Sequence, residues 1–323
     1  MACHAPASEL IFRRLAKPSL TSSSTHLLVV ELWGLGDLAL AIPFLRTAAA
    51  HTRVTLLAKP HAAPLLARFA PGIELVPLIA PWTAFRSKYR LLRWPWRELA
   101  RTRGKLRAQR IDFGISARRD PRDHALLALA GARRRLGFPR AGSGIFLSDS
   151  LAAPARPHRA EYWRSLASAL GWDLPPSSPP GRTGRRIVVH TGAGQPTRTW
   201  PRERFENLAA HLRDVGWEVV LLDDSLRNVD HLLTVLASAD RFIGNDSGPG
   251  HLAALLGVPT FTIFGPSLPE LFSTLHPDAG WIEGAACRYR PCWDYCRYAE
   301  PRCIRAITVE QVWTRLDEWL KRK

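Results

Sequence analysis

The feature that most constrains the fold is an alternation of short apolar segments with helix-like segments, which occurs twice along the chain. Short apolar runs separated by helices are typical of parallel strands buried on both faces. We predict strands at 27–32, 54–58, 73–78, 112–116, 187–190, 218–222, 241–245 and 260–264. We predict helices at 38–50, 60–69, 123–131, 161–170, 202–215, 229–237, 249–256 and 309–320. The pattern predicts an α/β fold with two Rossmann-like, doubly wound parallel sheets.

A segment rich in proline and glycine at 171–186 separates the two series. A segment of that composition cannot carry regular structure. The length of 323 residues suits two domains of about 150 residues each. We therefore predict a flexible tail at 1–25, a first domain at 26–170, a linker at 171–186, a second domain at 187–306 and a final helix within 307–323. Ligands bind at the carboxyl ends of such strands, so we expect a cleft between the domains there.

The first glycine-rich loop, Gly34-Leu-Gly36-Asp37-Leu-Ala39, follows a strand and opens a helix. Glycines allow close approach of a ligand to the backbone, and a helix N-terminus favours negative charge. Asp37 is unusual in such a loop, and it is either a helix cap or a general base. The loop also fits the dinucleotide fingerprint, but Lys59 ends the second strand where that fingerprint expects an acid.

Two further loops in the second half point to an anionic ligand. The loop His190–Pro201 contains Thr191, Gly192 and Arg198. The planar guanidinium of Arg198 suits a phosphate group, while the alternative is a surface cation beside a tryptophan that only packs. The loop Gly244–Leu252 contains Asp246, Ser247, Gly248 and His251 at a strand-to-helix turn. Its backbone N–H groups would face a diphosphate, while the alternative is that Asp246 and Ser247 only cap the helix.

The formal net charge is +17, and most of it is concentrated in one stretch. Between Trp82 and Arg140 there are seventeen Lys and Arg residues against four acidic ones. Nucleic acid, an anionic membrane or an acidic substrate would each account for this excess, as would a solvated Arg-rich surface. Within 82–110, Trp82, Trp94 and Trp96 accompany ten basic residues, and Pro95 predicts a helix–break–helix surface unless the tryptophans pack inward.

Other patterns bear on metals and on location. Four of the five cysteines, Cys287, Cys292, Cys296 and Cys303, fall close together without the paired C-x2-C spacing of common zinc sites. Their role is left open between loop packing and a metal site. No run reaches the ~18 apolar residues of a membrane span, and the N-terminus has no signal-peptide pattern. We expect a cytoplasmic protein that makes peripheral contact with an anionic membrane surface through its basic segment.

Taken together, these segments resemble glycosyltransferase family 9, which includes the lipopolysaccharide heptosyltransferases. GNDSGPGHLAALLGVPTFTIFGPSLP is similar to the signature of that family, and GLGDLALAIPFLR, ARRDPRDHALLALAGARRRLGF, HTGAGQPTRTWP and CRYRPCWDYCRYAEPRCIRAITVEQV follow the family order. The family often has Lys at the position of Arg198. It also has a longer segment than residues 223–241, so the donor base and sugar stay open.

The resemblance implies a GT-B architecture whose C-terminal helix crosses back to the first domain. It implies an inverting transfer, without metal or other cofactor, from a nucleotide sugar such as ADP-heptose to an anionic lipid-linked core saccharide. Asp37 would be the base. Gly36, Thr191, Gly192, Arg198, Asp246, Ser247, Gly248 and His251 would hold the donor, and Arg118, Arg119 and Arg122 the acceptor. We expect a monomer that does not bind nucleic acid.

Two other classes of protein remain alternatives at this point. A nucleic-acid-binding protein would account for the charge but not for the three glycine-rich anion loops. An NAD(P)-dependent oxidoreductase would use the first loop and leave the other two without a role.

Overall fold

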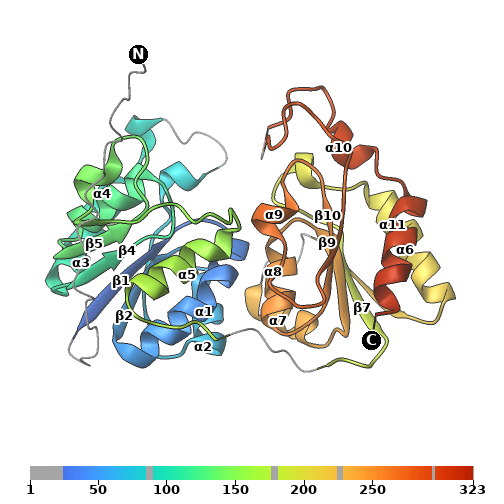
Figure 1. Cartoon of the computed structure of the whole chain (residues 1–323), viewed down its shortest axis with the longest axis horizontal. Coiled ribbons are helices and arrows are strands. Elements are labelled where there is room, and N and C mark those ends of the chain that lie inside the picture. Colours follow the sequence, from blue (N-terminus) through green and yellow to red (C-terminus); the bar gives the residue numbers. More distant parts are fainter. Residues whose placement is uncertain (1–24, 85–89, 176–180, 224–227, 293–294, 323) are drawn as a thin grey trace, which may run out of the picture.

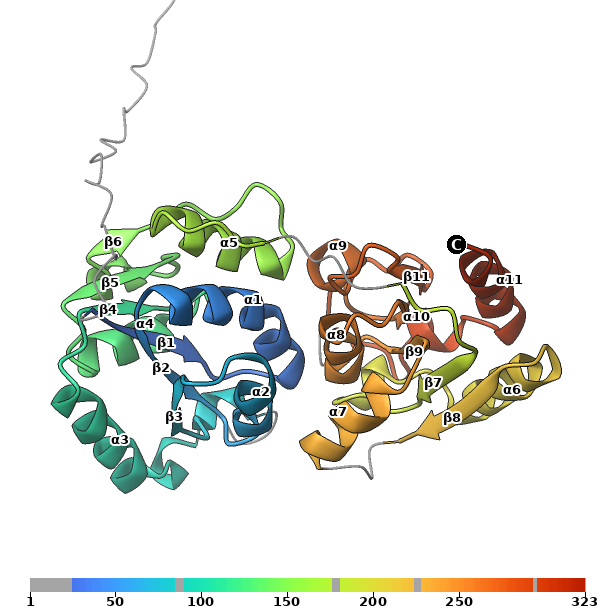
Figure 2. The same ribbon diagram turned by 90° about the horizontal axis from the view of Figure 1, so that it is seen from below.

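The computed structural model describes residues 25–84, 90–175, 181–223, 228–292 and 295–322. Two parallel sheets form two lobes that stand side by side, with helices on both faces of each sheet (Figures 1 and 2). No helix among the described residues is long and apolar enough to cross a lipid bilayer.

The first sheet has the strand order β3-β2-β1-β4-β5-β6. Its strands are β1 (His26–Glu31), β2 (Arg53–Ala58), β3 (Glu74–Pro77), β4 (Phe113–Ile115), β5 (Arg134–Gly137) and β6 (Asp149–Ser150). Its helices are α1 (Leu35–His51), α2 (Ala62–Phe69), α3 (Trp96–Ala108), α4 (Pro121–Leu129) and α5 (Arg159–Ala169), with short 3-10 turns at Pro81–Thr83, Leu91–Arg93 and Ser143–Phe146. The strand order reverses between β1 and β4, which is where doubly wound sheets bind ligands.

The second sheet has the order β11-β10-β9-β7-β8. Its strands are β7 (Arg186–His190), β8 (Glu218–Leu222), β9 (Arg241–Asn245), β10 (Thr260–Phe264) and β11 (Gly280–Glu283). Its helices are α6 (Arg202–Asp214), α7 (Val229–Ala237), α8 (Gly248–Leu255), α9 (Pro269–Phe272), α10 (Arg302–Arg305) and α11 (Val309–Leu320), with a 3-10 turn at Pro196–Arg198. Here the order reverses between β7 and β9. The α/β class and the parallel sheets predicted from the sequence are confirmed.

The last helix corrects one prediction. We expected the final segment, 307–323, to cross back to the first lobe, but α11 packs on α6 and β11 of the second lobe (Figure 1). The reason is its apolar stripe, Val312, Leu316 and Trp319, which joins the core formed by Trp200 and its neighbours on one face of the second sheet. A Thr308–Gln311 capping box starts the helix there.

The two lobes meet along helices rather than through the linker alone. Helix α1 packs against α8, and α2 against α7. The backbones approach closely at Gly36, where a Cβ atom would lie 2.8 Å from the His251 ring and 3.4 Å from the Cα of Gly248. Glycine at both positions therefore lets the N-termini of α1 and α8 approach each other closely.

Candidate active site

Asp37 lies in the first turn of α1, directly after β1 at the switch point of the first sheet. Its Oδ2 accepts a 3.3 Å hydrogen bond from the N–H of Gly34, which is the residue before the helix. The carboxylate therefore has a capping contact, and its other oxygen is turned toward two arginines. Both alternatives raised by the sequence, cap and base, are compatible with this geometry.

Two arginines from distant segments converge on Asp37. Arg118, which follows β4, contacts Oδ1 of Asp37 through Nη2. Arg159, the first residue of α5, places Nε 3.6 Å from the same oxygen. Adjacency of β1 and β4 explains the first pairing, because the carboxyl ends of neighbouring parallel strands share one edge.

The charges around Asp37 set its proton affinity. Burial acts to raise the pKa of the Asp37 carboxyl, but Arg118, Arg159 and the Gly34 N–H outweigh it and lower that pKa. Burial together with Arg118 lowers the pKa of Arg159 to about 10. Burial also lowers the pKa of Lys59, which follows β2 and interacts with the charge of Asp37. At neutral pH the site therefore holds an ionised Asp37 among cations.

Of the three arginines predicted to bind the acceptor, only Arg118 reaches Asp37. Arg119 is exposed and donates a 3.4 Å hydrogen bond to the Pro139 carbonyl. Arg122 forms a bidentate pair with Asp120, with distances of 2.9 and 2.6 Å, and Asp120 is the residue that caps α4. The sequence placed these arginines in one segment but could not predict their different partners, and their role toward an acceptor stays a prediction.

Behind Arg118 lies a buried carboxyl group, Asp123. Burial, together with the charges of Asp120 and Glu31, raises the pKa of Asp123 to about 7. The carboxyl of Asp123 lies 3.5 Å from Oγ of Ser116. Oγ of Ser116 in turn accepts a 3.1 Å hydrogen bond from the N–H of Arg118. This group supports the backbone that carries Arg118.

In the second lobe, Asn245 joins the two predicted donor loops. Its side-chain amide donates to the carbonyls of Thr191 and Gly192 at 3.1 and 3.0 Å. Its Oδ1 accepts a 2.9 Å hydrogen bond from the N–H of Trp200. Because Asn245 ends β9 and the loop follows β7, the pair of loops frames the switch point of the second sheet.

The predicted diphosphate residues lie around this frame. Arg198 places Nη1 3.6 Å from Oδ2 of Asp246, and that oxygen also accepts a hydrogen bond from the Ser267 hydroxyl. Ser247 precedes α8 in extended conformation, and its side chain bonds to the Asn245 carbonyl rather than capping the helix. The first N–H groups of α8 are thus not satisfied by that side chain, which suits an anionic ligand.

His251 connects the two lobes at this point. It is buried on α8 against Gly36, and burial lowers the pKa of its imidazole despite the charges of Asp246 and Asp37. Beside it, Nε2 of His158 lies 2.9 Å from the Ser273 carbonyl, again across the lobes. The residues predicted for base and donor, Asp37 and Gly248 to His251, are therefore brought together.

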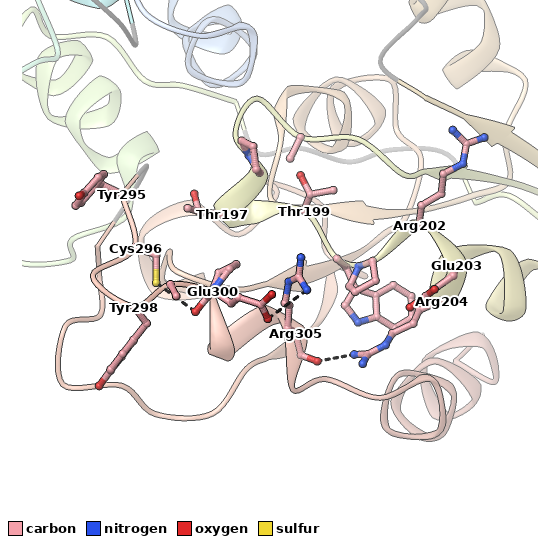
Figure 3. Close-up of a pocket in the computed structure, with 16 residues that line it drawn as sticks. Thr197, Thr199, Arg202, Glu203, Arg204, Tyr295, Cys296, Tyr298, Glu300 and Arg305 are labelled. Atoms are coloured by element: carbon pink, nitrogen blue, oxygen red, sulfur yellow. Dashed lines mark hydrogen bonds and ion pairs between the residues drawn. The ribbon is translucent and has the colours of Figure 1, made fainter.

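The cysteine-rich segment forms one wall of a recess of about 990 Å³. Figure 3 shows Tyr295, Cys296, Tyr298 and Glu300 around the recess together with Thr197 and Thr199 of the Arg198 loop. Arg305 and Glu300 form an ion pair of 3.3 Å there. Cys287, Cys292, Cys296 and Cys303 are free, half-buried thiols. Within the described residues, which exclude 293 and 294, no three His, Cys, Asp or Glu side chains are grouped as a metal site.

Sequence reasoning missed Glu31, Lys59, Arg159, His158 and Asn245 as members of the site. A charged residue ending an apolar strand was a usable signal for Glu31. Arg159 had no such signal, because nothing in a helix-start pattern reports on a carboxylate far away in the chain.

Comparisons with known proteins bear on the family and the fold of the chain. The sequence model of "Glycosyltransferase family 9 (heptosyltransferase)" matches residues 225–297. The lipopolysaccharide heptosyltransferase 1 of Pseudomonas aeruginosa is 28% identical over 212 residues, which cover 50% of this chain and 59% of that protein. The chain thus spans little more than half the length of that curated relative.

Solved structures share the fold over most of the chain. The E. coli heptosyltransferase WaaC with ADP superposes with a TM-score of 0.72 at 18% identity, covering 91% of this chain and all of that one. The iron-containing dodecameric glycosyltransferase TibC of enterotoxigenic E. coli gives 0.56 at 18% identity, covering 92% and 79%. The chain is therefore similar in sequence to the heptosyltransferases of glycosyltransferase family 9 and shares their GT-B fold.

Proposed function

We propose that this protein is a glycosyltransferase that moves a heptose from a nucleotide diphosphate to an anionic acceptor resembling the lipopolysaccharide core. The observation that carries the proposal is the meeting of Asp37 with the N-terminus of α8 across the two lobes, at Gly36, Gly248 and His251. A base on one lobe thereby faces an anion-binding helix end on the other.

The donor diphosphate would lie against the second lobe. The N–H groups at the start of α8 and the guanidinium of Arg198 would meet its charge, with Thr191, Gly192, Ser247 and His251 around it. Arg198 would exchange its contact with Asp246 for the phosphate. The ADP in the related WaaC structure makes an adenine nucleotide the first donor to test.

Transfer would proceed with inversion at the anomeric carbon. Asp37 takes the proton of the acceptor hydroxyl as its oxygen attacks the anomeric carbon from the face opposite the diphosphate. The bond to the diphosphate breaks, and the negative charge that develops there is stabilised by Arg198 and α8. In this scheme the protein itself supplies the negative charge of the base and the positive charge that stabilises the leaving diphosphate, and neither a metal nor a further cofactor takes part.

The acceptor would approach along the first lobe, where Lys59, Arg118, Arg119 and Arg122 supply positive charge. We further propose that the protein acts as a monomer on the cytoplasmic face of the inner membrane. Its peripheral contact would be the basic segment around α3, with the exposed Leu91, Leu92 and Trp96 next to arginines.

A nucleotide panel tests the proposal and its rivals. Thermal shift with ADP-sugars, UDP-sugars and NADPH should show stabilisation by a sugar nucleotide, followed by transfer to a core saccharide. Stabilisation by NADPH alone would instead favour an oxidoreductase, and salt-dependent retention of duplex DNA a nucleic-acid-binding protein.

Arg198 supplies the matched variants for the donor site. Arg198→Ala should weaken binding of the stabilising nucleotide sugar by about 10-fold or more, since one charge-assisted contact contributes roughly 1.5–3 kcal/mol. Arg198→Lys should recover part of the loss, because it keeps the charge but not the fork. Unchanged affinity of Arg198→Ala by calorimetry would move the phosphate site elsewhere.

A further inference from the structure

Glu31 is a buried carboxylate directly behind the proposed base. It ends β1, and its side chain is only 1% exposed. Its Oε1 accepts a 3.2 Å hydrogen bond from the Trp33 N–H, and within the described residues Oε2 has no hydrogen-bond partner. A charge at such a position is costly unless neighbouring charges compensate it.

The compensating charges are the same arginines that contact Asp37. Nε of Arg118 lies 3.9 Å from Oε1 of Glu31, and Nη2 of Arg159 lies 3.9 Å from Oε2. These distances exceed those of hydrogen bonds, so the attraction is Coulombic. Two carboxylates therefore share two guanidinium groups, and neither carboxylate has both to itself.

The arginines are held unequally. Arg159 is 8% exposed, and its Nη1 donates a 2.7 Å hydrogen bond to the Ala117 carbonyl. Arg118 is 18% exposed, and its guanidinium lies 4.9 Å over the Trp33 ring. Arg159 is thus a fixed internal charge, whereas Arg118 lies nearer the side from which the acceptor would come.

This sharing matters for proton transfer. A carboxylate paired with two guanidinium groups binds a proton weakly, and a weaker base accelerates transfer less. The pKa of Asp37 is already lowered by Arg118 and Arg159. The other charged or titratable groups around Asp37 are Glu31, Lys59 and His251, and Glu31 is the acidic one among them. Burial and the charge of Asp37 raise the pKa of Glu31. Because this repulsion acts both ways, an ionised Glu31 opposes the effect of the arginines on Asp37.

We propose that Glu31 is a positioning residue that shares Arg118 and Arg159 with Asp37 and so keeps the proposed base from being fully neutralised by them. The inference rests on the proposed function. It assigns Glu31 no contact with either substrate, and it requires Glu31 to be ionised while the enzyme turns over.

The test compares Glu31→Gln with Glu31→Asp and with Glu74→Gln. Glu74 is a matched control, because it also pairs with two basic residues, Arg53 and Lys105, but lies on β3, away from Asp37. kcat and the KM for acceptor are measured across pH, together with donor affinity. Thermal unfolding reports whether each variant folds.

With Glu31→Gln we expect kcat to fall by about 10-fold and the acid limb of its pH profile to move to lower pH. The KM for the anionic acceptor should stay the same or decrease, since the site becomes more positive. Donor affinity should not change. Glu31→Asp should restore much of kcat, and Glu74→Gln should behave as wild type. A purely structural role would instead raise KM and lower stability without moving the limb.

A double variant covers the case in which Glu31→Gln fails to fold. Glu31→Gln with Arg159→Gln removes both buried charges, and its acid limb should return toward that of the wild type. The inference would be overturned if Glu31→Gln kept the wild-type kcat and an unmoved acid limb. It would also be overturned if the acid limb of the double variant were displaced to lower pH. Absence of transfer by the wild-type protein from any sugar nucleotide would instead overturn the proposed function.

Discussion

At the residue scale, the ambiguity of Asp37 has a physical basis. The residue occupies the first turn of α1, where a carboxylate is favoured by the helix dipole whether or not it reacts. Its 3.3 Å contact with the Gly34 N–H is long, and its other oxygen contacts Arg118 and Arg159, while the charge of the carboxylate also interacts with His251 of the second lobe. A substitution that keeps the hydrogen bond to the Gly34 N–H but removes the basic carboxylate of Asp37 therefore distinguishes its role as a helix cap from its role as a general base.

Asp37→Asn is that change. We expect transfer to fall by about 10²–10⁴-fold, the usual scale for losing a general base, while donor affinity stays nearly constant. The amide oxygen can still accept from the Gly34 N–H, so helix α1 should remain intact. Transfer assays and calorimetry on the same preparation check this, and activity within a few-fold of wild type would leave Asp37 as a cap only.

Asp123 predicts a dependence of stability on pH. Its folded-state pKa of about 7 lies above the ordinary value of 3.8, so the folded chain binds this proton more tightly than the unfolded chain. Its contribution is therefore present at low pH and is lost as pH rises from about 4 to 7. Asp123→Asn should remove that loss.

The expected difference follows from the size of the shift. The free energy of unfolding of Asp123→Asn, relative to that of wild type, should increase by up to about 4 kcal/mol between pH 4 and pH 8, at 1.36 kcal/mol per pH unit between the two pKa values. Urea unfolding at both pH values measures it. The exposed Glu98 provides a control, and parallel pH curves for wild type and Asp123→Asn would contradict the prediction.

At the element scale, the basic segment divides its tryptophans between core and surface. Trp82 is buried, and Trp94 lies between it and Trp96, with ring centroids at 5.5 and 5.3 Å. Trp96 itself is 55% exposed and Leu92 fully so. Among the described residues a three-residue 3-10 turn, Leu91–Arg93, precedes Pro95 and helix α3 follows it, so the predicted break is present but the first helix of the helix–break–helix prediction is only a turn. Trp82 therefore packs into the core, whereas the exposed apolar surface begins at the Leu91–Arg93 turn.

This surface predicts binding to anionic vesicles. The wild-type protein should co-sediment with vesicles containing anionic lipid, release at high salt and ignore neutral vesicles. Replacing Leu91, Leu92 and Trp96 with Ser should weaken binding by about 10-fold or more, because three exposed apolar side chains are lost. Trp281→Ser, at an exposed tryptophan of the second lobe, should have no effect. Equal binding to both vesicle types would reject an electrostatic contact.

At the scale of the whole molecule, the site exists only where the two lobes touch. Gly36 and Gly248 remove the side chains that would otherwise separate α1 from α8. The core beneath them contains residues of both lobes, such as Leu38 and Leu252, so the contact is apolar as well as close. The distance from the proposed base, Asp37, to the predicted donor loop is therefore set by this interface.

Gly36→Ala should disturb that distance. Its Cβ would lie 2.8 Å from the His251 ring, so the lobes must shift apart or the ring must move. We expect transfer to fall by about 10²-fold, the scale for a misplacement of 1 Å. Gly104→Ala is the control, since no atom lies within 4 Å of the added Cβ. Kinetics with small-angle scattering checks the prediction, and wild-type transfer by Gly36→Ala would contradict it.

The sequence by itself determined the order of the main helices and strands and the three loops that carry the donor and base residues. These features are local, because strand and helix periodicities and glycine at a turn depend on neighbours in the chain. It did not reveal β5, whose Arg134 and Arg135 break the apolar strand pattern, or β6, which has two residues. Its domain boundaries and its donor and acceptor assignments stay predictions.

Only the tertiary structure decided which charges meet. Arg118 reaches Asp37 because β4 pairs with β1, and Arg159 reaches it because α5 packs on α1. The sequence pattern of the apolar stripe of α11 is compatible with packing on either lobe, and in the structure the stripe packs into the core of the second lobe. Sharing of two arginines between Glu31 and Asp37 is likewise a product of sheet order and helix packing, and no periodicity in the chain encodes it.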